Sequence, residues 1–397
     1  MIEEESAGPK RRWWFFPLLF FLTAIICLLV AEAAVRIFWS PDHPRQPRRY
    51  EFDLEVGIAH IPGHYLLPFR RCVGGQSECE DVSVNFTIND QGFRGRNFRD
   101  PAGHPLVAVL GDSMIEAAQV DDDKTACRIL EESLRQQFDA EVRNIGVSSA
   151  GLVHYYARWR KYVASMRPDA LVIATLGIND FRNCSTSLEH FIAMRPHYTE
   201  SADGKGEVSF EPAPNPHSRL RRLAASLYEP LETVRFFRWL KEARKETVEA
   251  DASGLFPDFR IYEDPPAPEY AEATAIGQQY LERLIKEATA AGSRVIVVYL
   301  PWSGEAIDAE WAALAAKHQQ SEQAARATRN RPEQLVKTTA EAAGARFVSF
   351  SEFIRSLPPE RLPALWHIKT DSHLTEEGNR MLAECLKLAV TDALKPY

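Results

Sequence analysis

The sequence has few of the residues that build metal centres and nucleic-acid surfaces. It contains six cysteines in 397 residues, and no CxxC pair or Cys/His cluster has the spacing of a metal site. The net charge is -8 and no long basic run occurs, so nucleic acid is excluded as an expected partner. No internal repeat of useful length is present, which argues against a solenoid or a propeller. With 45% hydrophobic and 26% charged residues, the chain is expected to be globular. We also expect it to need no metal or other cofactor.

Five of the six cysteines fall in three kinds of place. Cys27 lies inside a long apolar run near the N-terminus. Cys72 and Cys79 bracket a short loop with two glycines, which a disulfide could close. Cys127 and Cys385 fall on the apolar faces of predicted helices, where buried free thiols are the ordinary outcome.

What the N-terminus has instead is one long uncharged segment. An N-terminal tail, residues 1–12, ends in Lys10, Arg11 and Arg12 and precedes "WWFFPLLFFLTAIICLLVA" at 13–31. Nineteen helical residues can cross a hydrocarbon core of about 30 Å. The "AEA" at 31–33, a small-x-small pattern, could alternatively be the cleavage site of a signal peptide. The run is longer than the usual core of such a peptide, roughly 7–15 residues, so an uncleaved transmembrane signal anchor is expected at 13–35.

Proline, glycine and arginine are frequent between this anchor and residue 104, and we expect residues 36–104 to be a membrane-proximal segment packed on the main domain. One alternating stretch, at 82–90, suggests a strand there. Residues 105–397 form the main domain, interrupted at about 183–265 by an insertion with Pro clusters and an amphipathic helix at 216–246. Such a helix most often packs on its own domain, although it could also contact lipid or a partner.

The main domain alternates apolar strands with amphipathic helices. Strands are expected at 106–110, 140–147, 169–177, 294–300 and 345–350. Helices are expected at 124–138, 151–166, 269–292, 321–343 and 375–394. This alternation predicts an α/β protein, a flavodoxin-like three-layer α/β/α fold with a parallel sheet, preceded by one transmembrane helix.

Four short motifs fall where the predicted strands end or just before the last helix. They are "GDSM" at 111–114, "NIGVSSAG" at 144–151, "GIND" at 177–180 and "DSH" at 371–373. In open α/β sheets ligands bind beyond the carboxyl ends of the strands, so the motifs should meet at one edge. Chance could supply one of them, but hardly all four.

These motifs resemble those of the SGNH hydrolases, also called the GDSL esterase/lipase family, and the resemblance covers residues 105–397. "NDQGFRG" at 89–95 is similar to the membrane-anchored bacterial branch of that family. The resemblance implies the SGNH hydrolase fold and a serine esterase that acts on ester bonds without a cofactor.

The chemistry of three side chains fits this activity. Ser113 would be the nucleophile, and a serine hydroxyl needs an adjacent base because it is a poor nucleophile near neutral pH. His373 would be that base, since imidazole can take the serine proton and later return it to the leaving group. Asp371 would hold the imidazole tautomer. For Ser113 alone the alternative is a turn residue, because Gly-Asp-Ser also suits a turn.

The tetrahedral intermediate carries an oxyanion, which needs donors already in place. The predicted donors are the backbone N–H of Ser113, the amide of Asn179 and a backbone N–H of the 146–151 loop. In that loop the glycine that relatives use aligns with Ser149, while Gly146 or Gly151 could serve instead. Asp112, Gly177 and Asp180 are expected to support the site by ordering the turns rather than by reacting.

The sequence departs from the common family pattern before the histidine. Many relatives have Asp three residues ahead of it, where this chain has Thr370, and Asp371 stands two ahead. Some membrane-anchored and polysaccharide-modifying branches share the shorter spacing. An extended segment would place residues two apart on one side, which would let Asp371 reach His373. His367 could instead pair with Asp371 in a structural role.

The resemblance to these branches suggests the substrate and the location. The expected substrate is an O-acyl group, with O-acetyl as the leading case, on an extracytoplasmic glycan, or a small ester. The alternatives are an O-acetyltransferase of a cell-surface polysaccharide and a glycan-binding scaffold without turnover. Basic residues flank the anchor almost equally on its two sides. The expected function therefore decides the placement: a single-pass protein of the inner (cytoplasmic) membrane with its main domain outside the cytoplasm.

Overall fold

The structure is a computed structural model that describes most of residues 15–395. Outside the description lie 1–14, 40–46, 54, 75–77, 100–102, 186–187, 189–195, 201–207, 213–230, 235, 238–239, 241–258, 264, 318–327, 368–371 and 396–397. The chain divides into two compact units, one of residues 1–44 with 217–255 and one of residues 45–216 with 256–397.

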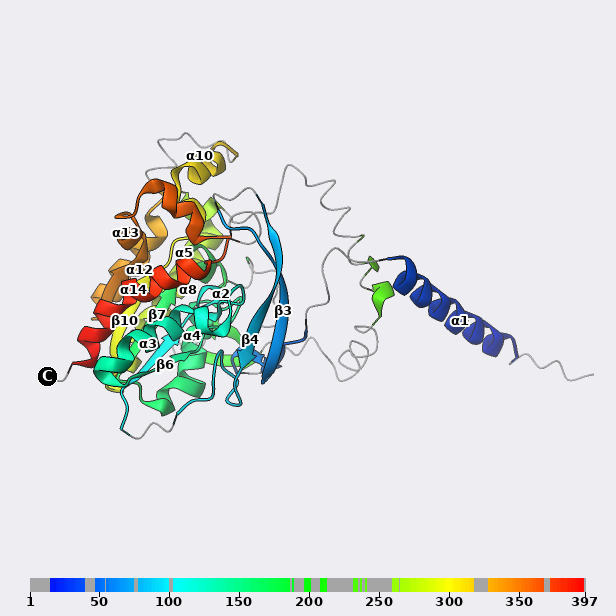
Figure 1. The fold of residues 1–397 in the computed structure, drawn as a ribbon, viewed down its shortest axis with the longest axis horizontal. Coiled ribbons are helices and arrows are strands. Elements are labelled where there is room, and N and C mark those ends of the chain that lie inside the picture. The colour runs from blue at the N-terminus through cyan, green and yellow to red at the C-terminus, as the bar shows by residue number, and fades with distance from the viewer. Residues whose placement is uncertain are drawn as a thin grey trace, which may run out of the picture. The chain divides into compact units, whose positions relative to one another are not determined.

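The first unit contains α1 (Phe15–Phe38), the blue helix of Figure 1, which is long and apolar enough to cross a membrane. An 18-residue window of α1 has a mean hydropathy of 2.6, and none of it is buried. A signal sequence has the same properties, so this helix fits both alternatives for the N-terminus. Near the end of α1 the Glu32 carboxylate accepts the N–H groups of Glu232 and Thr233 at 2.9 and 3.0 Å. The described part of the insertion helix thus contacts α1.

The second unit is built on a five-stranded parallel sheet. Its order is β11 (Arg346–Ser349), β10 (Arg294–Tyr299), β7 (Ala170–Thr175), β5 (Leu106–Leu110) and β6 (Glu141–Asn144). Every residue of β5 and β7 is buried, as expected for central strands covered on both faces. The order is that of a flavodoxin-like sheet, which confirms the predicted fold class.

Two groups of helices cover the sheet (Figure 1). α3 (Ala126–Phe138) packs with α14 (Glu376–Leu394), while α8 (Pro268–Ala290) packs with α4 (Leu152–Arg158) and α12 (Arg331–Ala342). Right-handed crossovers produce this division, because the chain leaves β5 in one direction along the sheet and then returns in the other. The shorter helices are α2 (Ser113–Glu116), α5 (Gly177–Arg182), α9 (Ser303–Ala306), α10 (Asp308–Lys317) and α13 (Phe350–Ile354).

The segment before β5 is more regular than predicted. It forms two antiparallel pairs, β1 (Tyr50–Asp53) with β2 (Gly57–His60) and β3 (Gly63–Arg71) with β4 (Glu80–Ile88). A disulfide joins Cys72 to Cys79 and closes the β3–β4 connection. Residues 45–104 belong to the same compact unit as the sheet, whereas residues 36–44 belong to the other unit. The insertion contributes a third antiparallel pair, β8 (Pro196–Glu200) with β9 (Val208–Pro212).

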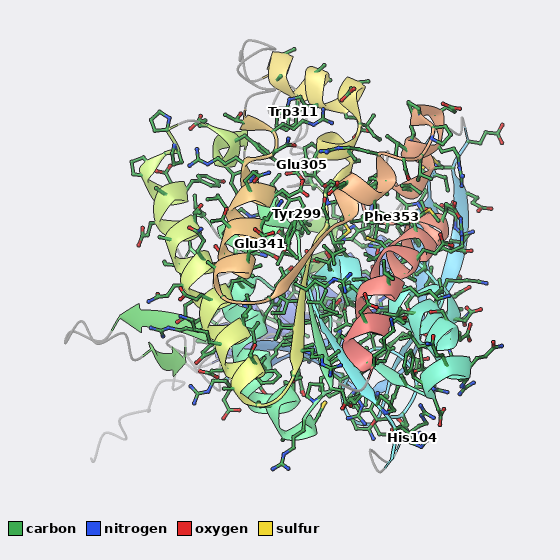
Figure 2. The ribbon with its side chains drawn as sticks, turned by 90° about the vertical axis from the view of Figure 1, so that its left-hand side faces the viewer. His104, Tyr299, Glu305, Trp311, Glu341 and Phe353 are labelled. Carbon is green, nitrogen blue, oxygen red and sulfur yellow. A yellow bond between two sulfur atoms is a disulfide. The ribbon has the colours of Figure 1, made fainter. Side chains whose placement is uncertain are left out.

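The strand register brings the carboxyl ends of the sheet to one edge. Leu110 is paired with Ile173 in β7, and Tyr299 is paired with both Thr175 and Ser349. Figure 2 places Glu305 toward this edge and His104, which precedes β5, at the opposite one. The chain crosses from one side of β5 to the other between β6 and β7, so the topological switch point lies where β5 and β7 end.

Candidate active site

Ser113 begins α2 directly after β5, at the switch point. The Asp112 side chain caps this short helix by accepting the N–H of Met114 at 2.9 Å. Gly111 precedes the cap, and a Cβ there would collide with the side chain of Ile115. The chain can therefore turn this tightly after β5 only with glycine at 111, which gives the Gly-Asp-Ser motif a local physical reason.

His373 reaches Ser113 from the loop before α14, 260 residues away in the sequence. Its Nε2 lies 2.8 Å from Ser113 Oγ, a hydrogen-bond distance suited to proton transfer. The loop is held across its base, because the N–H of His367 donates to the carbonyl of His373 at 2.9 Å and Trp366 bridges Leu374. The structure thus brings together the predicted nucleophile and the predicted base.

The β3–β4 pair supports this histidine loop from outside the sheet. Phe69 packs edge-on against the His367 ring with centroids 5.0 Å apart. The N–H of Gly74, inside the disulfide-closed connection, donates to the Trp366 carbonyl at 3.0 Å. His367 is buried beneath the loop, and its position against Phe69 fits a structural role.

The predicted orienting acid, Asp371, lies outside the described residues, as does Thr370. Ser372 is described and has a φ of 57°, in the left-handed region. The expectation of an extended segment leading to His373 is therefore wrong at this residue. The predicted end of this loop is confirmed, because α14 starts at Glu376 and the Thr375 side chain accepts the N–H of Gly378.

Asn179 lies in the first turn of α5, just after β7. Its amide nitrogen donates to the Asp112 carboxylate at 3.0 Å, and its amide oxygen accepts from Arg182 at 2.9 Å. These two contacts fix the orientation of the amide and use one of its two N–H groups. Among the described residues the second N–H has no hydrogen-bond acceptor. Asp112 therefore links the Ser113 turn to the predicted oxyanion donor.

Beneath this pair lies a second buried acid, Asp180. Its carboxylate accepts the N–H of Leu176 at 3.0 Å and the hydroxyl of Tyr155 at 2.9 Å. Burial raises the pKa of Asp180 well above its usual range, and the neighbouring Asp112 charge adds to this. Burial likewise raises the pKa of Asp112. Both acids accept backbone N–H groups of the turns in which they lie. Gly177 is also needed, since a Cβ there would lie 2.8 Å from the Tyr299 ring.

The loop after β6 contains three candidates for the third oxyanion donor, and their hydrogen bonds distinguish them. The N–H of Gly146 is donated to Asn144 Oδ1 at 2.9 Å, and that of Gly151 to His154 Nδ1 at 3.2 Å. Gly146 and Gly151 are therefore excluded as oxyanion donors, because their N–H groups already bond within the protein. Ser149 is exposed and has a φ of 63°, a left-handed conformation that favours glycine. Glycine, the residue that the resemblance aligns with Ser149, adopts this conformation without strain.

Sequence reasoning missed one part of the site, the buried carboxylate of Glu116 at the end of α2. It accepts hydrogen bonds from Tyr50 at 2.8 Å and from Ser148, and it pairs with His60 Nε2 at 2.5 Å. Burial alone would raise the pKa of Glu116. The hydrogen bonds and the attraction of His60 outweigh it and lower the pKa to about 2. Glu116 stands three residues after Ser113, but only the fold could reveal partners 56 and 66 residues upstream.

Asn179→Ala is expected to reduce the rate of ester hydrolysis by about 10²–10³-fold, the usual effect of removing one oxyanion donor. The change should leave KM for a small ester nearly unaltered, because the donor acts on charge that develops in the transition state. Steady-state kinetics with p-nitrophenyl acetate measure this. A loss below tenfold, in a variant that melts like wild type, would assign Asn179 a structural role.

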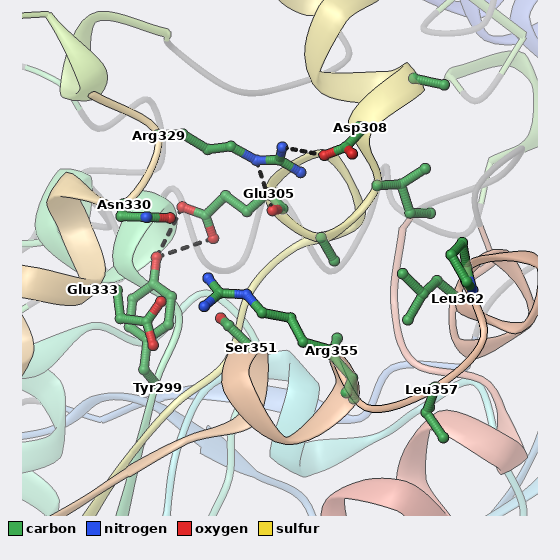
Figure 3. A pocket seen from close by; sticks show the side chains of 15 residues that line it. Tyr299, Glu305, Asp308, Arg329, Asn330, Glu333, Ser351, Arg355, Leu357 and Leu362 are labelled. Atoms are coloured by element: carbon green, nitrogen blue, oxygen red, sulfur yellow. Dashed lines mark hydrogen bonds and ion pairs between the residues drawn. The ribbon is translucent and has the colours of Figure 1, made fainter. Parts of the chain in front are cut away.

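A separate cavity of about 630 Å³ lies at the ends of β10 and β11. Figure 3 shows Glu305 and Tyr299 on one side of it and Arg355 on another. Neither Ser113 nor His373 lines it. Glu305 is partly buried and accepts the hydroxyls of Tyr262 at 2.6 Å and Tyr299 at 2.8 Å. Burial raises the pKa of Glu305 to about 8 despite these hydrogen bonds.

This acid should make stability depend on pH. The folded chain keeps a proton on Glu305 up to about pH 8, whereas the unfolded chain releases it near its ordinary pKa of 4.5. Between those values unfolding releases a proton, so Glu305 lowers the free energy of unfolding by about 1.4 kcal/mol for each unit of rising pH. In Glu305→Gln, whose amide oxygen can still accept from both tyrosines, this slope should disappear. Denaturant unfolding at pH 5.5, 6.5 and 7.5 compares the two proteins, and parallel curves would show that Glu305 ionises normally.

The fold and the site together define a class of protein, a three-layer α/β/α hydrolase with a serine hydroxyl beside an imidazole at the carboxyl edge of its sheet. The chain belongs to the GDSL-like lipase/acylhydrolase family, whose sequence model matches residues 109–381. It is therefore a hydrolase that acts on ester bonds and has the SGNH hydrolase fold. This confirms the family, fold and enzyme class predicted from the four motifs.

Several solved structures are similar to the chain, with low sequence identity and low TM-scores. A G-D-S-L family lipolytic protein from Desulfitobacterium hafniense is 12% identical, with 72% of this chain and 99% of that chain covered and a TM-score of 0.37. The acetylxylan esterase Axe2 from Geobacillus stearothermophilus is 15% identical, with 74% and 95% covered and a TM-score of 0.38. A GDSL-like lipase from Parabacteroides merdae is 13% identical, with 75% and 99% covered and a TM-score of 0.38. No curated protein matches the chain.

Proposed function

We propose that this ester hydrolase is anchored in the inner membrane by α1 and removes O-acyl groups, with O-acetyl as the leading case, from a glycan outside the cytoplasm. The observation that carries the catalytic part is the 2.8 Å distance between Ser113 Oγ and His373 Nε2. The substrate class is supported by the short spacing between Asp371 and His373, which this chain shares with polysaccharide-modifying branches. The location is supported by the length and hydropathy of α1.

The proposed mechanism gives each of these side chains one role. His373 Nε2 takes the hydroxyl proton of Ser113 as Oγ attacks the ester carbonyl carbon. The carbonyl oxygen becomes an oxyanion, which accepts from the N–H of Ser113, the second amide N–H of Asn179 and the N–H of Ser149. Asp371 holds Nδ1 of the imidazole and stabilises its charge. Collapse of the intermediate breaks the ester C–O bond, and His373 returns its proton to the sugar oxygen.

The second half of the cycle uses the same groups. Water enters, His373 removes one of its protons, and the oxygen attacks the acyl-enzyme. The carboxylic acid then leaves and Ser113 recovers its proton. If a sugar hydroxyl took the place of water, the same residues would transfer the acyl group instead of releasing it.

The function is tested on the full chain in detergent, with p-nitrophenyl esters of increasing acyl length and a panel of O-acetylated polysaccharides. Acetate release from a polysaccharide, faster for short acyl groups and absent in Ser113→Ala, is the expected result. Acyl transfer to an added saccharide at the expense of hydrolysis would replace the esterase by the transferase. Glycan binding without turnover or labelling by a fluorophosphonate would leave only the scaffold.

The anchor makes a separate prediction. The protein should stay in the membrane fraction through alkaline carbonate washing, because a 24-residue apolar helix holds it there. Protease added outside the inner membrane should digest residues 45–397. A mature chain that begins near Ala34 would show a cleaved signal peptide, and protection of the main domain would show the opposite orientation.

A further inference from the structure

Glu116 has a buried carboxylate near the site, and the mechanism above does not use it. The side chains of Glu116 and His60 are both fully excluded from solvent. Burying a charged pair costs free energy that its attraction does not reliably recover, so such pairs are weak evidence for a purely stabilising role. The position of Glu116, one helical turn after Ser113, suggests what the pair does instead.

Two of its partners come from the membrane-proximal segment. Tyr50 in β1 and His60 in β2 are directly opposite each other in the antiparallel register, so their side chains lie on the same face. Their ring centroids are 5.4 Å apart. The Tyr50 hydroxyl reaches both carboxylate oxygens of Glu116, at 2.8 and 3.0 Å, while His60 contacts one of them. The β1–β2 pair therefore grips the carboxylate with two adjacent side chains.

The third partner comes from the loop after β6. Ser148, the residue before Ser149, donates its hydroxyl to the carboxylate oxygen of Glu116 that His60 does not contact. A side chain at the end of β6 also holds the backbone of α2, because Asn144 Nδ2 donates to the Ile115 carbonyl at 2.6 Å. A Cβ on Gly146 would lie 2.5 Å from the Glu116 nitrogen, so no larger residue fits between loop and helix.

One more residue of the upstream segment secures the end of α2. The guanidinium of Arg94 is buried and donates to the Glu116 carbonyl at 3.2 Å and to the Val120 carbonyl at 3.0 Å. The turn that starts at Ser113 is thus held at its far end through both the backbone and the side chain of Glu116.

Glu116 does not itself reach a substrate. Its side chain is buried, it lies at the end of α2 opposite Ser113, and its imidazole partner is His60 rather than His373. It can influence the reaction only through the elements that it joins.

We propose that Glu116 is a positioning residue: held by Tyr50 and His60, it fixes the Ser113 turn against the Ser148–Ser149 loop, so that the nucleophile and this oxyanion donor keep their spacing. The membrane-proximal segment is then part of the active site's support. The inference rests on the proposed function, because it assigns Ser149 an oxyanion N–H. Displacement of a reacting group by about 1 Å can reduce a rate by about 10²-fold. Weakening the contacts of Glu116 should therefore lower kcat.

The test compares Glu116→Gln with a matched control, Glu131→Gln. Glu131 in α3 is also a buried carboxylate, paired with Arg128 at 2.7 Å and accepting the N–H of Val142, but it contacts none of the site residues named above. Both variants should lower the melting temperature. Only Glu116→Gln should also reduce kcat for p-nitrophenyl acetate and the rate of fluorophosphonate labelling at Ser113, each by roughly tenfold or more, with KM changed less than twofold.

Tyr50→Phe provides a milder variant if Glu116→Gln does not fold, since it removes a single hydroxyl. It should reduce kcat in the same way to a smaller extent, and its effect should not add to that of Glu116→Gln. If both changes leave kcat and labelling at wild-type values while the melting temperature falls, Glu116 only stabilises the fold and the inference is overturned. Failure of the proposed function is distinguishable, because wild type itself would then neither turn over nor be labelled.

Discussion

Replacing Ser113 by alanine is expected to abolish ester hydrolysis, with a loss on the order of 10⁴-fold or more in kcat. The hydroxyl is the only group of this residue that can form the acyl-enzyme, and its neighbour His373 has no substitute nucleophile to activate at that position. The protein should stay folded, because Ser113 is half-buried and the cap of α2 is provided by Asp112 rather than by Ser113. Turnover of p-nitrophenyl acetate and thermal melting measure the two parts of this expectation.

Ser148→Ala is not a suitable control here, because its hydroxyl belongs to the Glu116 network. Ser133→Ala in α3 removes a hydroxyl that bonds only to the Leu130 carbonyl of its own helix, and it should hydrolyse esters at the wild-type rate. Wild-type turnover in Ser113→Ala itself would remove this serine from the mechanism.

Asp371→Asn should produce the second large effect, a loss of about 10⁴-fold in kcat. His373 presents Nε2 to Ser113, so Nδ1 is the nitrogen that an orienting acid has to hold. An asparagine amide can donate to Nδ1, which would place the imidazole proton on Nε2, and that tautomer cannot accept the serine proton. The loss should therefore fall on kcat, while the melting temperature stays close to that of wild type.

Thr370→Val is the matched control, since it changes the position where many relatives carry the acid. If Thr370→Val retained activity and Asp371→Asn lost it, the short spacing would be functional. If Asp371→Asn kept most of its activity, Asp371 would not be the orienting acid and Ser113 with His373 would act as a pair.

Much of the sheet could be predicted because its strands carry unambiguous signals. The run 106–110 is wholly apolar and ends at Gly111, and every one of its residues is buried in β5. The start of α14 was readable from Thr375, whose side chain caps that helix. The motifs at 111–114 and 177–180 then located Ser113 and Asn179, because parallel strands place their carboxyl ends at one edge.

Other features could not be predicted, for reasons that lie in the fold. β3 contains Pro68, which weakens a strand signal, but proline is tolerated there because β3 pairs with β4 alone. The left-handed conformation of Ser372 has no marker in a serine side chain. The contacts of Glu116 join segments far apart in the sequence, and no local pattern encodes them. Only the fold could decide among the glycines of the loop after β6, since their N–H partners come from its packing.

The central claim is that His373 activates Ser113 as the nucleophile of an ester hydrolase, and covalent labelling tests it most directly. The full chain is treated with a fluorophosphonate, digested and analysed by mass spectrometry, alongside a His373→Gln variant. We expect one phosphonyl group per chain, attached to Ser113, with loss of hydrolytic activity in proportion to labelling and little reaction in His373→Gln. Labelling at another serine, or equal labelling of Ser113 with and without His373, would contradict the account.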